Sequence, residues 1–160
     1  MSTNPENVLV LEVLGKQIQI ELLADTAPGH VERVKLLASE GFYDNCPFHR
    51  VIDGFMAQTG DGSNRDGTGG SDYPNLKAEF SSVKHERGTV SMARAASEDS
   101  ANSQFFICFD AHPHLDGQYT VFGKITDGLD VIDQIKKARP GYDMVQDPDV
   151  ITKAYVLADA

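Results

Sequence analysis

Apolar and polar residues alternate near the start of the chain in the way that is typical of half-buried strands. Residues 17–22, QIQIEL, alternate without error, and residues 8–13, VLVLEV, precede them with Gly15 in between. A period of two places successive side chains on opposite faces of a sheet. Two such runs joined by a turn residue predict an opening β-hairpin.

The pattern then changes to a helical period. Ala27-Pro28 predicts the start of a helix, because proline suits the first helical position. Gly41 is placed to end that helix. The apolar residues between them give one stripe along a helix face: Val31, Val34, Leu37 and Ala38.

Turn signals divide the rest of the chain into short segments. Asp53-Gly54, Arg87-Gly88 and Asp116-Gly117 are turn dipeptides that separate runs of strand-forming residues. The strands are expected at residues 49–52, 55–58, 89–93, 104–109, 120–125 and 150–157.

A second short helix is predicted at residues 130–138. Apolar residues recur there at helical spacing, and Pro140-Gly141 ends the segment. Roughly eight strands and two helices without a βαβ rhythm favour an antiparallel sheet closed on itself, with helices over its ends. Neither a repeat nor a linker interrupts the pattern, so residues 1–160 are expected to form a single domain.

Composition narrows the classes of partner. A net charge of −10, from 24 acidic and 14 basic residues, argues against a broad surface for nucleic acid or for an anionic membrane. The first residues, MSTNPEN, are polar, and no apolar run reaches the length of a membrane span. A soluble cytoplasmic protein is therefore expected.

The cysteines and histidines do not predict a metal site. Cys46 and Cys108 have no zinc spacing and adjoin large apolar residues, so reduced, half-buried thiols are expected. His112 and His114 flank a proline, but two ligands are too few for a metal site. We therefore expect neither a metal nor a cofactor.

The glycine-rich segment at residues 60–70, GDGSNRDGTGG, matches two ligand-binding patterns only in part. It lacks the final G-K-[ST] of a phosphate-binding loop. As a calcium loop, it would place Arg65 at the fifth position and Asp66 where glycine is needed. A mobile surface loop is the interpretation that remains.

A hydrolytic triad is not indicated either. Ser71, Ser91 and Ser103 lie in no G-x-S-x-G turn, and no spacing ties any of them to a histidine.

The segment SQFFICF, residues 103–109, has two different faces if it is a strand. Phe105, Ile107 and Phe109 share one side and suit a core, whereas Gln104, Phe106 and Cys108 share the other. The segment FHRVIDGFMAQ mixes large apolar residues with an arginine and a glutamine in the same way. If the two segments are neighbours, they form an apolar patch with hydrogen-bond donors at its rim. The alternative, that the aromatic residues are simply core, is equally compatible with the spacing.

Five segments in order resemble the cyclophilins, a family of peptidyl-prolyl cis-trans isomerases. They are FHRVIDGFMAQTGD at 48–61, GTGG at 67–70, SMARA at 91–95, SQFFI at 103–107 and HLDGQYTVFGKI at 114–125. The compact stretch between Gly70 and Ser91 resembles the bacterial members. The resemblance implies an all-β fold, a closed eight-stranded antiparallel β-barrel capped by two α-helices, with a packed interior and a substrate groove on the outside.

The resemblance also implies roles for individual residues. The catalytic set would be Arg50, Phe55 and Gln58. The substrate-binding set would be Met56, Ala93, Arg94, Ala95, Gln104, Phe106, His114, Leu115 and Tyr119. Within these sets, the proline ring would be held by Phe55, Met56, Phe106 and Leu115.

The implied activity is isomerisation of X-Pro bonds during protein folding, without a cofactor. The implied partners are proline-containing peptides and unfolded or folding proteins; a monomer that binds neither nucleic acid nor membrane is expected.

Three residues depart from the commonest eukaryotic pattern: His114 replaces tryptophan, Tyr119 replaces histidine and Arg94 replaces asparagine. His114 predicts weak cyclosporin binding, and Arg94 predicts a preference for acidic substrates. These departures also motivate an alternative, a proline-peptide-binding module with little turnover.

Overall fold

The computed structural model describes residues 4–159, and their first strands form the predicted hairpin. A one-turn 3-10 helix, η1 (Pro5–Asn7), leads into β1 (Val8–Val13), which pairs antiparallel with β2 (Lys16–Leu22). The two turn residues, Leu14 and Gly15, have φ angles of 56° and 72°. Two positive φ angles match the turn type whose twist fits a tight hairpin.

Helix α1 (Pro28–Ser39) begins and ends where the sequence predicts. The whole predicted apolar stripe is buried, and Gly41 follows the helix with a φ of 75°. Ala27 offers no side-chain cap, so Glu79 from a distant loop caps the helix instead. Its carboxylate accepts hydrogen bonds from the amides of Gly29 (3.1 Å) and His30 (2.9 Å) and from His30 Nδ1 (2.6 Å).

All of the predicted strands are present, with bounds within two residues of those expected. After α1, the chain forms β3 (Cys46–Pro47), β4 (Arg50–Ile52), β5 (Met56–Thr59), β6 (Thr89–Met92), β7 (Phe105–Cys108), η2 (Pro113–Leu115), β8 (Val121–Asp127), α2 (Leu129–Ile132), β9 (Val150–Val156) and η3 (Leu157–Asp159). The sequence did not predict β3, which is only two residues long.

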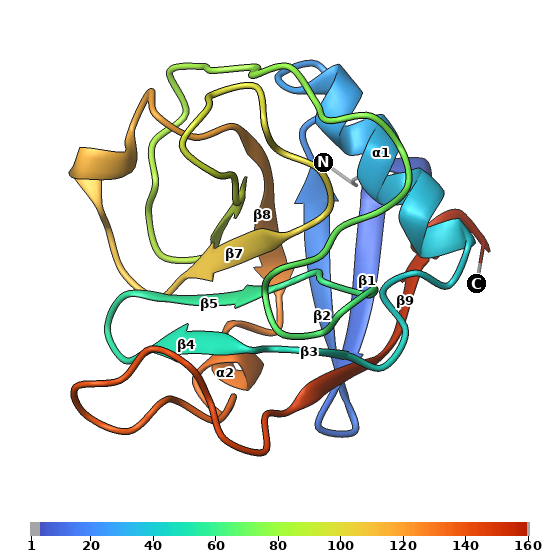
Figure 1. Ribbon diagram of the computed structural model, residues 1–160. Helices are drawn as coiled ribbons and strands as arrows, with labels where there is room; N and C mark the ends of the chain where they lie inside the picture. The colour runs from blue at the N-terminus through green and yellow to red at the C-terminus, as the bar shows by residue number, and fades with distance from the viewer. Residues whose placement is uncertain (1–3, 160) are drawn as a thin grey trace.

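Across residues 4–159, nine strands form one antiparallel sheet in the order β3-β9-β1-β2-β8-β6-β7-β5-β4. The sheet curls into a barrel, with α1 at one end and α2 toward the other (Figure 1). The two outermost strands, β3 and β4, are separated in sequence only by Phe48 and His49. The predicted barrel is confirmed, but it has nine strands instead of eight, and the described residues form no ladder between β3 and β4. The seam of the barrel, between β3 and β4, is closed by the covalent chain through Phe48 and His49 instead of by a ladder of hydrogen bonds.

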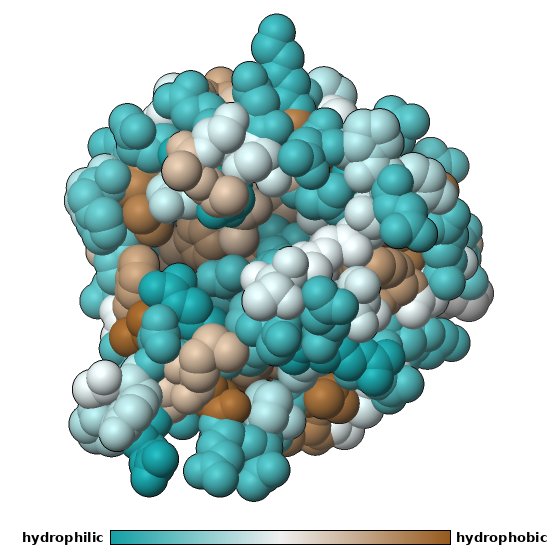
Figure 2. Space-filling view, viewed as in Figure 1, coloured by the Kyte–Doolittle hydropathy of each residue, from teal (hydrophilic) through white to brown (hydrophobic). Residues whose placement is uncertain are grey.

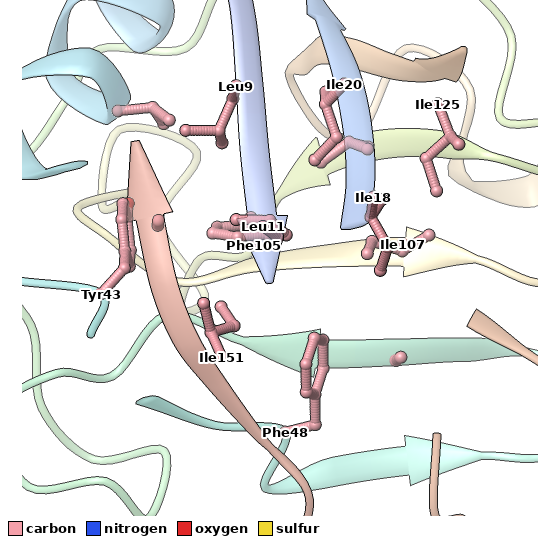
Figure 3. Packing of buried hydrophobic residues seen from close by; sticks show 14 of the residues in the cluster. Leu9, Leu11, Ile18, Ile20, Tyr43, Phe48, Phe105, Ile107, Ile125 and Ile151 are labelled. Atoms are coloured by element: carbon pink, nitrogen blue, oxygen red, sulfur yellow. The ribbon is translucent and has the colours of Figure 1, made fainter. Parts of the chain in front are cut away.

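Side chains fill the interior of the barrel. Residues from β1, β2, β7 and β9 point into the space that the sheet encloses (Figure 3). Phe105 contacts Tyr43 and Phe122 edge to face, with ring centroids 5.5 and 5.8 Å apart. Both cysteines are free and fully buried, which corrects the expectation of half-buried thiols. Burial raises the pKa of Cys108 to about 12, so this thiol is not a nucleophile at neutral pH.

The second helix is shorter than predicted. It covers Leu129–Ile132 instead of residues 130–138. Beyond it, backbone amides bond to other parts of the chain: Lys136 to Asp149 Oδ2 (2.8 Å) and Ala138 to the carbonyl of Val51 (2.9 Å). These tertiary hydrogen bonds replace the helical ones, although Ile135 is buried as the apolar spacing predicts.

We expect Glu79→Ala to lower the free energy of unfolding by about 1–3 kcal/mol, because the helix amides and His30 would lose a charged acceptor. Glu32→Ala removes the same charge from an exposed position on α1 and should change stability by less than about 0.5 kcal/mol. Urea unfolding of both variants at pH 7 measures the difference. Equal stability of the two variants would contradict the capping role.

Candidate active site

The strand registers gather the predicted site residues on the outer face of the barrel. Arg50 on β4 lies opposite Gln58 on β5, and Gln58 lies opposite Phe106 on β7. Residues directly opposite one another share a face of the sheet. Gln104 precedes Phe106 by two residues, so it is expected on that face too. The sequence predicted this mixture of polar and aromatic residues but could not establish that the segments are neighbours.

A small apolar cluster lies on this outer face, separate from the barrel core. Its buried members are Met56, Phe106, Cys108 and Leu115, and its partly buried members are Ile52, Phe55, Ala93 and Tyr119. Phe105, Ile107 and Phe109, from the other face of the same segment, belong to the barrel core. The spacing left open whether these aromatic residues form a surface patch or belong to the core. Phe55 and Phe106 belong to the outer patch.

This patch forms the floor of a cavity of about 320 Å³. Figure 2 shows a hollow on the same side of the molecule as Figure 1, with apolar residues at its floor and hydrophilic residues around it. The predicted site residues that line the cavity are Arg50, Phe55, Met56, Gln58, Ala93, Arg94, Phe106, Leu115 and Tyr119. An apolar floor with a few polar groups at the rim is typical of a ligand site.

A second cavity of about 390 Å³ adjoins the first and has a more polar lining. Ala95 and Gln104 line this one, together with Asn75, Ser100 and Asn102. Gln58, Gly67, Thr68, Ala93 and Arg94 line both cavities. His114 lines neither cavity, but its ring centroid lies 6.1 Å from that of Phe55 at the rim.

Arg50 is held by two side chains. Its Nη1 donates to Gln58 Oε1 and its Nε to Asp143 Oδ2, each at 3.3 Å. Gln58 Nε2 donates in turn to Gln104 Oε1 at 3.0 Å. Among residues 4–159, Nη2 of Arg50 makes no hydrogen bond, so it is available to a ligand at the cavity.

Arg94 folds back onto its own chain. Its guanidinium donates to the carbonyls of Gln118, Ala95 and Ala96 and lies 4.6 Å from the ring centroid of Tyr119. In the described part of the chain it forms no salt bridge with a carboxylate. The side chain therefore ties two segments together while its charge remains uncompensated.

His85 lies beneath the aromatic floor, a position that the sequence did not suggest. Its ring stacks against Phe106 with centroids 6.1 Å apart. Nδ1 lies 3.0 Å from Asp116 Oδ1, and Nε2 lies 2.9 Å from Ser91 Oγ. Burial lowers the pKa of His85, although the hydrogen bond with Asp116 opposes this, so the ring is neutral at pH 7.

Serine, histidine and aspartate thus meet in the order of a hydrolytic triad, although no sequence spacing linked them. Ser91 is fully buried and also lies 3.1 Å from the carbonyl of Thr120. Ser91 cannot attack a substrate, because none can reach it. The three side chains instead support Phe106 and the segment that carries Leu115 and Tyr119.

Asp143 and Met144 also reach the site without a sequence signal. Asp143 bonds to Arg50, and Met144 lines the apolar cavity. Both follow the Pro140-Gly141 turn in a segment without apolar periodicity, far from Arg50 in sequence. The backbone bridge between Arg50 and Met144 brings that segment to β4.

Residues 4–159 contain no group of three or more His, Cys, Asp and Glu side chains placed to hold a metal ion. They also contain no helix that is long and apolar enough to span a membrane. The expected cytoplasmic location stays a prediction.

Comparison with known proteins gives consistent matches over almost the whole chain. Residues 8–156 match the family model described as cyclophilin type peptidyl-prolyl cis-trans isomerase/CLD. A probable peptidyl-prolyl cis-trans isomerase of Brucella suis is 48% identical over 169 residues, covering 99% of this chain and 86% of that protein. Peptidyl-prolyl cis-trans isomerase B of Bacillus subtilis is 47% identical over 117 residues, covering 72% of this chain and 80% of that protein.

Solved structures show the same likeness. A cyclophilin from Hirschia baltica superposes with a TM-score of 0.90 at 26% identity, covering 100% of this chain and 77% of that one. A cyclophilin type peptidyl-prolyl cis-trans isomerase from Cryptosporidium parvum, crystallised in the presence of the dipeptide Ala-Pro, gives a TM-score of 0.84 at 27% identity. That match covers 93% of this chain and 98% of the other.

The free energy of unfolding should decrease as the pH is lowered from 7.5 to 5.5, because burial lowers the pKa of His30, His49 and His85. The unfolded chain takes up protons near pH 6.5, whereas the folded chain keeps these rings neutral to lower pH. Within residues 4–159, His30 Nε2 and His49 Nδ1 have no hydrogen-bond partner, so a proton there would be buried without an acceptor.

Each histidine should contribute up to about 1.4 kcal/mol per pH unit within this window. Carboxylates with lowered pKa values affect stability mainly below about pH 4.3 and so do not interfere. Urea unfolding at pH 7.5, 6.5 and 5.5 tests the slope. A protein equally stable at pH 5.5 and 7.5 would show that the histidines titrate normally.

Proposed function

The chain belongs to the cyclophilin-type peptidyl-prolyl cis-trans isomerases, and from that membership we propose that Arg50 and the apolar cluster beside it carry the isomerisation. The observation that supports this assignment is the position of Arg50, which borders the cavity floored by Phe106 and Met56. Isomerisation of X-Pro bonds is the activity of the family. The roles of individual residues are the proposal.

The reaction needs no nucleophile and no proton relay. Rotation about a peptide bond is slow because C–N resonance imposes a barrier of about 18–20 kcal/mol. In the twisted amide, the prolyl nitrogen regains its lone pair and becomes a better hydrogen-bond acceptor. A catalyst therefore has to bind this twisted state more tightly than either planar isomer.

The apolar cavity suits the proline ring. Phe55, Met56, Phe106 and Leu115 offer a dry surface that would hold the ring while the preceding carbonyl rotates. Water is largely excluded from such a floor, which strengthens hydrogen bonds made at its edge.

Arg50 is the proposed donor to the prolyl nitrogen. Its guanidinium keeps its charge, and two neighbours hold it through Nη1 and Nε while Nη2 has no partner within residues 4–159. A hydrogen bond to a charged group contributes about 1.5–3 kcal/mol. Made only in the twisted state, such a bond would accelerate the reaction by about 10- to 150-fold.

The substrate backbone would bind along the polar part of the site. Gln58 and Gln104 supply amide groups, and Ala93, Arg94 and Ala95 supply the adjoining strand edge. The uncompensated charge of Arg94 supports a preference for acidic residues near the proline. We propose unfolded or folding proteins with exposed X-Pro bonds as the clients of a monomeric enzyme.

Arg50→Ala should lower kcat/KM by about 10- to 150-fold, and Arg50→Lys should recover only part of the loss, because lysine lacks the planar fork. Arg139→Ala removes an exposed arginine and serves as the matched control. A protease-coupled assay on a proline tetrapeptide measures all three variants. Unchanged catalysis in Arg50→Ala would refute the proposed mechanism.

His114→Trp should tighten cyclosporin inhibition by about tenfold or more, because a buried aromatic ring contributes about 1.5–3 kcal/mol. His114 lies at the rim beside Phe55, where an indole could cover a bound ligand. Ala111→Trp places the same ring at an exposed position of the same segment as a control. Equal inhibition of His114→Trp and the parent protein would exclude this explanation of weak binding.

A further inference from the structure

Asp61 is a fully buried carboxylate that takes part in no salt bridge within residues 4–159. Backbone amides surround it instead. Oδ1 accepts from Ser63 (3.1 Å) and Asn64 (2.9 Å). Oδ2 accepts from Asp66 (3.2 Å), Gly67 (3.0 Å) and Gly69 (2.9 Å). One carboxylate thus organises most of the glycine-rich loop at residues 60–70.

The glycines of this loop let its backbone lie close to Asp61. A Cβ added to Gly69 would lie 2.5 Å from Asp61 Oδ1, and one added to Gly67 would lie 2.9 Å from the ring of His49. Gly67 also has a φ of 96°, which other residues rarely adopt. The segment does not match a phosphate-binding or calcium-binding loop, but close packing explains why glycine occupies positions 67 and 69.

The same loop holds Gln104. Its Nε2 donates to the carbonyls of Gly67 (2.9 Å) and Gly69 (2.8 Å), the two glycines whose own amides donate to Asp61 Oδ2. Gly67 and Gly69 are therefore held twice, through their amides by Asp61 and through their carbonyls by Gln104.

The two carbonyls fix the direction of a row of amides. With both hydrogens of Gln104 Nε2 engaged, its Oε1 faces Gln58 and accepts from Gln58 Nε2 at 3.0 Å. The oxygen of Gln58 then faces Arg50 and accepts from Nη1 at 3.3 Å. If Gln104 were reversed, Gln58 would present an NH2 group to the guanidinium, and two donors would repel each other.

We propose that Asp61 is a positioning residue for Arg50, acting through the loop at residues 60–70, Gln104 and Gln58. This inference rests on the proposed role of Arg50 in catalysis. The chemistry supports an ionised Asp61: burial raises its pKa, but the backbone hydrogen bonds from Gly69, Asn64 and others lower it below the usual value. Only a carboxylate can accept from amides on both oxygens, whereas an asparagine would turn an NH2 group toward donors.

The first experiment compares kcat/KM for Asp61→Asn, Gly69→Ala and Asp72→Asn with that of the parent protein. Gly69→Ala keeps the carboxylate but forces the loop away from it, because the added methyl would clash with Oδ1. We expect both loop variants to lose about tenfold, part of the loss expected from removing Arg50. Asp72 is exposed just beyond the loop, and Asp72→Asn should stay within about twofold.

Folded fractions are checked by circular dichroism at the assay temperature. Should Asp61→Asn not fold, Gly69→Ala carries the same prediction.

The second experiment repeats both loop substitutions in the Arg50→Ala background. If the loop acts through Arg50, each should then change kcat/KM by less than about twofold, because the group it positions is gone. A tenfold effect that remains in this background would mean that the loop acts through the fold or through the glutamines themselves, and it would overturn the inference.

Side-chain NMR signals separate this inference from the proposed mechanism. In Asp61→Asn, the NH2 signals of Gln104 and Gln58 and the guanidinium signal of Arg50 should shift, whereas in Asp72→Asn they should not. Unchanged signals would overturn the inference even if Arg50→Ala is inactive. Conversely, a harmless Arg50→Ala would refute the proposed mechanism while the NMR shifts still show that Asp61 orders the row.

Discussion

The site depends on one geometric constraint, the alternation of side chains along β5 and β7. Phe105 and Ile107 face the barrel core, so Phe106 must face outward, together with Cys108. The residues that stabilise the fold therefore fix the direction of the residues proposed to bind the substrate. A shift of one residue in register would exchange the two sets and remove both the core and the site.

Uncharged polar groups connect this rigid face to Arg50. Hydrogen bonds connect the loop carbonyls through two glutamines to Arg50, and each glutamine donates toward the loop and accepts from the side of Arg50. Such a row orients the guanidinium without neutralising it. Asp143 is the one carboxylate that touches Arg50 among residues 4–159, and it is more than half exposed, so solvent screens it strongly.

Local sequence patterns predicted the parts of this arrangement that depend on neighbouring residues. The hairpin, α1 and the two faces of the 103–109 segment follow from periodicity, and the family's motifs indicated the members of the site. Contacts between distant segments left no local signal. Asp143 meets Arg50 because its segment bridges to β4, and Asp116 meets His85 because β6 lies between β7 and β8 in the sheet. The truncation of α2 has the same origin, since the amides of Lys136 and Ala138 bond to Asp149 and to Val51 of β4 instead of continuing the helix.

The seam between β3 and β4 has a consequence for an enzyme whose substrates are polypeptide chains. Arg50 lies on an edge strand, and an open strand edge invites any extended chain to pair with it. Here the segment after Pro140 covers that edge: Val51 donates to the carbonyl of Asp143, and Val145 donates to the carbonyl of His49. A proline-containing peptide can therefore reach the hollow beside this edge, whereas the backbone of the edge is already paired. The paired part of this edge cannot serve as a template on which extended chains add as further strands.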